Sequence, residues 1–269
     1  MSVRRLAGAL LASTMLAAAA FLSPGADQGA PDGDAARLLD PAYVAASVCT
    51  GAAKRDEMFK PGFAVVRAAA AATAEAGAAA RPILYDNLGT LGFPITTREP
   101  MAQRWFDQGY RLAWAFNHEE ARRAFKEAQR LDPTCAMCAW GEAWVLGPNI
   151  NAPMAEAAVE PAFNAIARAQ ALAGGASEVE RALIVATAKR YSPDPAADRK
   201  ALDAAYADAL TEVAKRHPDH TEAQLLLADA LMNLSPWDYW QADRQTPKGR
   251  TAEIVTALDT VLQRNPDHP

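Results

Sequence analysis

The 269-residue sequence lacks the short motifs that mark the common enzyme classes. It contains no G-x-S-x-G, no H-E-x-x-H and no glycine-rich loop that would bind phosphate groups. Valine and isoleucine are too sparse for a large sheet, and no stripe of Lys or Arg marks a nucleic-acid surface. We therefore expect a non-enzymatic protein with no cofactor, no bound metal and no nucleic-acid partner.

Alanine, by contrast, is abundant. It dominates a hydrophobic fraction of 51%, and it is the residue that favours helices most strongly. Acidic and basic residues alternate along segments such as 119–126, a pattern typical of a solvated helix face. The composition predicts an all-α protein.

The N-terminus has the features of an export signal. Arg4 and Arg5 precede a mostly apolar stretch over residues 6–22, and the alanines at 17–20 offer cleavage positions. We expect a signal peptide over residues 1–26 and a periplasmic or extracellular location. The alternative is an uncleaved signal that anchors the chain in the membrane.

Two further segments precede the main helical region. Residues 27–39 are rich in Gly, Pro and Asp, which predicts a flexible linker. Residues 40–98 form a lead-in whose alanine-rich part, up to about residue 81, favours a helix. Gly, Pro and β-branched residues follow over 82–98, which predicts extended or irregular chain, with a short strand pair as an option.

A helical hairpin follows between residues 105 and 133, with its own residue spacing. Its marked positions are Trp105, Gly109 and Leu112 on the first helix, then Ala121, Phe125 and Ala128 on the second, and Pro133 at the end. This spacing resembles the tetratricopeptide repeat, a helix-turn-helix unit of about 34 residues. The resemblance implies a right-handed α-solenoid of stacked hairpins over residues 99–269.

The later repeats match this pattern only in outline. Helices are expected over 155–173, 177–191, 198–217, 221–234 and 251–265. Ser177 and Glu180 are spaced as a capping box, and the endings KRHPDH and QRNPDH are internal copies 48 residues apart. Because Pro269 directly follows a repeat terminator, we expect a longer parent protein.

The segment over residues 88–154 carries a CAMC-x-WG-x-A element followed by GPNIN. It is similar to a group of bacterial exported tetratricopeptide-repeat proteins. The resemblance implies an interaction scaffold that binds a protein or peptide partner in a concave groove, and it carries over no established activity.

Large aromatic residues are the main candidates for partner contact. They recur at helical spacing on two successive first helices, and they are Phe106, Tyr110, Trp114, Trp140 and Trp144. In the tetratricopeptide family such positions line the groove, but the same spacing also suits core packing between hairpins. Both interpretations remain open from the sequence.

Two other groups of residues are weaker candidates for a partner site. Asn149 and Asn151 of GPNIN either present amides at the groove rim or satisfy the local backbone. Trp237, Tyr239 and Trp240 in an inserted loop are either exposed to a partner or packed on the repeats.

Cys135 and Cys138 form a C-x-x-C at the start of a helix. This pair predicts a structural disulfide or packed thiols, and the alternative is a thiol-redox or metal-linked module. Ala139 follows Cys138, so haem attachment is not expected, and Cys49 is left without a fixed partner. A third possibility is a part of a larger enzyme whose active site lies beyond Pro269.

Overall fold

The computed structural model describes residues 82–269, which form eight α-helices and, over that range, no β-strand. The helices are α5 (Pro100–Trp114), α6 (His118–Leu131), α7 (Ala136–Val145), α8 (Val159–Leu172), α9 (Glu178–Ala188), α10 (Arg199–Arg216), α11 (Thr221–Leu234) and α12 (Thr251–Arg264). The expected all-α class is confirmed for this range. The predicted signal peptide, the linker, the helix before residue 81 and Cys49 lie outside the described residues.

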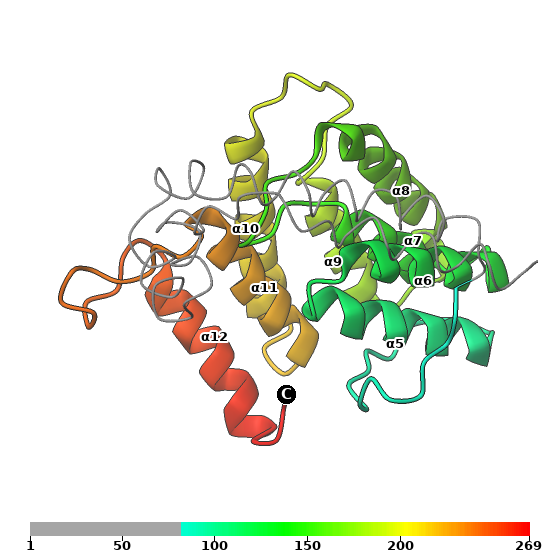
Figure 1. Cartoon of the computed structure of the whole chain (residues 1–269), viewed down its shortest axis with the longest axis horizontal. Coiled ribbons are helices and arrows are strands. Elements are labelled where there is room, and N and C mark those ends of the chain that lie inside the picture. The colour runs from blue at the N-terminus through cyan, green and yellow to red at the C-terminus, as the bar shows by residue number, and fades with distance from the viewer. Residues whose placement is uncertain (1–81) are drawn as a thin grey trace, which may run out of the picture. The chain divides into compact units, whose positions relative to one another are not determined.

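The helices pack in chain order. Each helix contacts the next from α5 to α12, and α5 also contacts α7, as α7 contacts α9 (Figure 1). Helix α7 therefore lies against both α5 and α9 as well as against its neighbours in the chain. None of the helices within residues 82–269 combines the length and the apolar character needed to cross a membrane.

The first hairpin, α5 with α6, is buried at the positions that the spacing marked. Pro100 starts α5, where its missing N–H leaves no bond unmade, and two glutamates occupy the first turn of α6. The marked side chains are all buried, namely Trp105, Leu112, Ala121, Phe125 and Ala128. The predicted helical hairpin is therefore confirmed.

Phe125 of α6 fills the space between α5 and α7. A Cβ atom added to Gly109 would lie 2.8 Å from its ring, and one added to Gly141 would lie 2.5 Å from it. Both glycines let the helix backbones approach this ring more closely than any other residue type would allow. Gly141 is a packing position that the sequence analysis did not identify.

Side-chain caps define the later helices near their expected bounds. Ser177 and Glu180 form the predicted capping box at the start of α9. The side chain of Asp198 caps α10, and that of His220 caps α11. Helix α9 ends at Ala188, before the predicted Tyr191, because the chain turns there and directs the following side chains inward.

Residues 82–98 run in extended form without pairing as strands, so the optional strand pair is wrong. Side chains of α5 bind the backbone instead. The Gln108 amide donates to the Ile83 carbonyl (2.8 Å) and accepts from the Tyr85 N–H (2.7 Å). The Gln103 amide likewise donates to the Phe93 carbonyl and accepts from the Ile95 N–H, each at 2.9 Å. These bonds replace a strand ladder.

The end of this segment is fixed to more distant helices. Glu180 accepts hydrogen bonds from the Thr96 N–H (2.5 Å) and the Thr96 hydroxyl (2.6 Å). The Thr97 hydroxyl donates to Asp132 at the end of α6 (2.6 Å). Phe93 is buried, with its ring 5.6 Å from that of Tyr110 and 6.2 Å from that of Trp140. The segment is thus an integral part of the helical fold.

Candidate functional site

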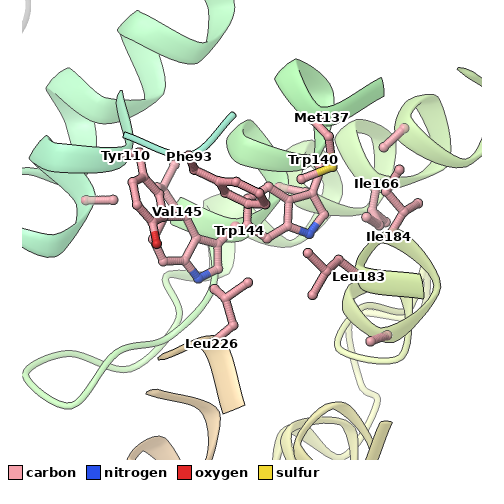
Figure 2. Packing of buried hydrophobic residues seen from close by; sticks show 14 of the residues in the cluster. Phe93, Tyr110, Met137, Trp140, Trp144, Val145, Ile166, Leu183, Ile184 and Leu226 are labelled. Atoms are coloured by element: carbon pink, nitrogen blue, oxygen red, sulfur yellow. The ribbon is translucent and has the colours of Figure 1, made fainter. Parts of the chain in front are cut away.

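The predicted aromatic residues form one continuous cluster. Phe106, Tyr110 and Trp140 have relative exposures of 0%, Trp144 has 7%, and Trp114 is half-buried. Figure 2 shows Trp140 and Trp144 side by side on α7, with Tyr110 and Phe93 facing them. The structure therefore places Phe106, Tyr110 and Trp140 in the core, where no partner can reach their rings in this arrangement.

The cluster is held by many ring contacts. Trp140 and Trp144 are stacked at 5.5 Å between centroids, and Trp114 meets Trp144 edge-on at 5.4 Å. Tyr110 lies 5.8 Å from Trp144. Each such pair adds about 1 kcal/mol beyond area burial, so the two outermost rings, Trp114 and Trp144, have fixed orientations.

These two tryptophans form a wall of a cavity of about 160 Å³ between α5, α7 and α11. We call it the tryptophan pocket. Its polar lining side chains are His118, Asn149, Arg190 and Asp229, and its apolar ones include Phe116, Ile150, Leu225, Met232 and Leu258. An apolar cavity with a few polar groups is the usual form of a binding site. A larger hollow near the C-terminus contains fewer of the predicted residues.

Asp229 is the acidic group of the pocket. It comes from α11, and the Trp144 indole N–H and the Asn233 amide donate hydrogen bonds to it. In Figure 2 the indole nitrogen of Trp144 points toward the helix that carries Leu226, which is α11. Burial raises the pKa of Asp229, and Arg190, Asn233 and Trp144 oppose this rise only in part.

Arg190 is fully buried, and its bonds are directed away from Asp229. Its Nε lies 3.2 Å from Asp203, one terminal nitrogen donates to the Pro148 carbonyl (2.6 Å), and the guanidinium stacks over Tyr206 at 4.8 Å. A Cβ added to Gly147 would lie 2.5 Å from the guanidinium. The glycine of GPNIN thus makes room for this buried charge.

Asn149 organises the loop that closes one side of the pocket. Its amide oxygen accepts from the Asn151 N–H (2.8 Å) and the Ala152 N–H (3.1 Å), while its amide nitrogen lies 3.2 Å from His118 Nδ1. Burial lowers the pKa of His118, so the ring is neutral at pH 7. Asn149 lines the pocket, but its amide group forms hydrogen bonds with the local backbone and contacts His118. Asn151 is exposed.

The inserted loop after α11 contacts the same region. The Trp237 indole N–H donates to the Ile150 carbonyl (2.9 Å), although the ring is 51% exposed. Trp240 is also exposed, whereas the Tyr239 hydroxyl donates to the Met232 carbonyl (3.3 Å). Both alternatives for this loop thus apply in part, because Tyr239 is packed while two tryptophans face solvent.

Cys135 and Cys138 are joined by a disulfide at the start of α7. Cys135 is the N-cap residue, and its sulfur accepts from the Cys138 N–H (3.1 Å). Both cysteines are buried, whereas redox-active cysteines are usually accessible to their substrates. Burial therefore favours the structural role of this pair over the redox one.

Sequence reasoning missed Asp229, Arg190 and Gly147. A signal for Asp229 was present, because it lies four residues after Leu225 and three before Met232, on the apolar face of α11.

Within residues 82–269 no group of three or more His, Cys, Asp or Glu side chains is placed to hold a metal ion. Comparisons with protein-family models, curated proteins and solved structures found no match.

Proposed function

We propose that this chain is an exported scaffold of the tetratricopeptide-repeat type, a right-handed α-solenoid that binds a protein or peptide partner and acts without catalysis. The stacking of α5 on α7 and of α7 on α9 supports the repeat architecture. The buried motif positions of the first hairpin support it as well.

The observation that carries the proposed function is the tryptophan pocket. Side chains of α5 and α7 meet there with side chains of α11, which comes much later in the sequence, and the exposed ring of Phe116 lies at its edge. Phe116 has a positive φ of 58°, a costly backbone conformation for a bulky residue. A pocket of aromatic and aliphatic walls accepts an anchoring side chain of a partner.

The extended segment over 82–98 shows how a chain can lie on these helices. Gln103 and Gln108 each bind one carbonyl and one N–H of the backbone, so they do not depend on the side-chain sequence of the segment. A partner peptide bound in the same mode would gain affinity from its backbone and specificity from its anchor.

The disulfide supports the proposed export. Disulfides persist in oxidising compartments such as the periplasm and are rare in the cytosol. A buried bridge between Cys135 and Cys138 therefore fits a location outside the cytosol.

Site-specific photo-crosslinking in cells tests the proposed function. A photo-reactive phenylalanine analogue at Phe116 is expected to give a discrete adduct with one partner, because this ring lies at the pocket edge. Val185 on α9 has a similar exposure, 55% against 51%, and does not line the pocket, so it is the matched control position. Equal adduct patterns at the two positions, or none at either, would contradict the proposal.

A second measurement uses a peptide from the captured protein. Phe116→Gly removes the ring and relieves the positive φ, so the fold is retained while the peptide should bind at least about fivefold more weakly, a loss of about 1 kcal/mol. Val185→Ala should leave the affinity unchanged. Titration by intrinsic tryptophan fluorescence reports both, because Trp114 and Trp144 line the pocket.

A further inference from the structure

Asp229 is a half-buried carboxyl group on the wall of the tryptophan pocket, and no cationic side chain forms an ion pair with it within residues 82–269. Arg190 and Arg199 form their ion pairs with Asp203 instead, and the hydrogen bonds to Asp229 come from the neutral side chains of Trp144 and Asn233. Removing a carboxylate from water is costly unless a cation or a proton neutralises it. The pocket therefore contains an acidic group that has no cationic group in direct contact.

The other titratable groups of the pocket do not supply this charge. Arg190 acts on Asp229 through its field, but its bonds go to Asp203 and the Pro148 carbonyl. His118 is tied to Asn149 and to the Ala113 carbonyl, and its lowered pKa keeps it neutral at pH 7. A cation that binds beside Asp229 therefore meets no competing cationic side chain in direct contact with this carboxyl, whose hydrogen-bond donors, Trp144 and Asn233, are neutral.

The remaining walls suit an organic cation better than a hydrated metal ion. Trp114, Trp144 and Phe116 present aromatic rings, and Leu225 and Met232 complete an apolar lining. Aromatic faces attract ammonium groups by about 0.5–2 kcal/mol, more when water is excluded. An anion would be repelled by Asp229, and a neutral apolar ligand would bury its carboxylate further.

The volume sets the size of the ligand. An apolar protein cavity of about 150 Å³ holds benzene, so the 160 Å³ of the tryptophan pocket accommodates a group of about six heavy atoms. The end of a lysine side chain and a small quaternary ammonium both fit this limit.

We propose that the tryptophan pocket binds an alkylammonium group, with Asp229 as its counterion and Trp114 and Trp144 as its aromatic walls. The inference rests on the proposed function in that this pocket receives the anchor of the partner. The ammonium group belongs either to a lysine side chain of that partner or to a small free cation.

The test uses the purified full chain and measures binding by tryptophan fluorescence and by the NMR signals of the indole N–H groups. The probes are n-butylammonium, which has the end of a lysine side chain, and tetramethylammonium. The neutral and anionic controls are 1-butanol, tert-butanol and butyrate. We expect saturable binding of an ammonium probe, at least tenfold tighter than its neutral counterpart, and no saturable binding of butyrate. The Trp144 indole signal should shift on binding, because its N–H donates to Asp229.

Two variants locate the effect. Asp229→Asn keeps the shape of the side chain and should weaken ammonium binding at least tenfold. Asp259→Asn changes the net charge equally at an exposed position of α12 outside the pocket, and should have no effect. If Asp229→Asn does not fold, the shift of the Trp144 indole N–H signal when an ammonium probe binds to the unchanged protein still tests whether the probe binds beside Asp229.

The outcomes separate the two proposals. Equal affinity for ammonium and neutral probes, or equal loss in the two variants, would overturn the ammonium site even if position 116 crosslinks to a partner. Ammonium binding without any partner adduct would support the site and contradict the scaffold function. Preference for n-butylammonium indicates a lysine anchor, and preference for tetramethylammonium indicates a free quaternary cation.

Discussion

Replacing Gly109 with Ala tests the packing between the first two hairpins. The new methyl group would lie 2.8 Å from the ring of Phe125, which is fully buried between Gly109 and Gly141. Gly141→Ala approaches the same ring from α7 at 2.5 Å and should cost more.

Two opposing effects set the magnitude. Overpacking a core costs about 1–3 kcal/mol, whereas Ala stabilises a helix interior by about 1 kcal/mol relative to Gly. We expect Gly109→Ala to lower the free energy of unfolding by about 1 kcal/mol and Gly141→Ala by about 2 kcal/mol. For a folded unit of this size, that corresponds to a drop in Tm of about 2–8 °C.

Urea and thermal unfolding followed by circular dichroism measure these values, and a double-mutant cycle isolates their cause. In a Phe125→Leu background the ring is absent, so Gly109→Ala should become neutral or stabilising, with a coupling energy of about 1–2 kcal/mol. Gly174→Ala is the control, because a Cβ at Gly174 meets nothing within 4 Å. Stabilisation by Gly109→Ala in the original protein, or the same cost in both backgrounds, would refute the reasoning.

Three further changes test other parts of the structure. Cys135→Ser should lower the free energy of unfolding by about 2 kcal/mol, since the lost bridge closes a short loop, and a thermal midpoint that does not move with reductant would contradict this. Glu180→Ala removes the α9 cap and the acceptor of Thr96, so urea unfolding should show it to cost at least about 1 kcal/mol more than Thr96→Val. Asp229→Asn should raise the free energy of unfolding at pH 7, because burial raises the pKa of this carboxyl above its unfolded value, so its ionised form destabilises the folded state. This destabilisation decreases as the pH falls through the folded pKa. The difference in free energy of unfolding between the two proteins, measured by chemical denaturation, should therefore shrink in acid.

Much of the fold could be predicted because local interactions determine it. The capping box of Ser177 and Glu180 involves residues three apart, and the hairpin of α5 and α6 joins neighbours along the chain. Such contacts leave a direct record in sequence spacing. The second role of Glu180, as the acceptor of Thr96, joins residues 84 positions apart and leaves no such record.

The site was less predictable for the same reason. Helical periodicity places Tyr110 and Trp114 on one face of a helix, but groove residues and core residues follow the same period. Which of the two side chains is exposed depends on how the later helices, such as α11, pack around them, and the periodicity does not contain this information. Asp229 joins the pocket only because the fold brings one face of α11 to the cavity that Trp114 of α5 and Trp144 of α7 also line. Its position within an apolar helix face was a signal of a partly buried acidic group, although this signal does not identify the residues around it.

The extended residues before α5 determine where a recombinant fragment of this protein can begin. A fragment that starts at Pro100 would lose the Phe93 ring, which packs against Phe106, Tyr110 and Trp140. Those three rings would then meet water, and Gln103 would lose its backbone partners. Such a fragment is expected to aggregate, whereas one that starts at or before Pro82 keeps the Phe93 ring that covers these aromatic residues.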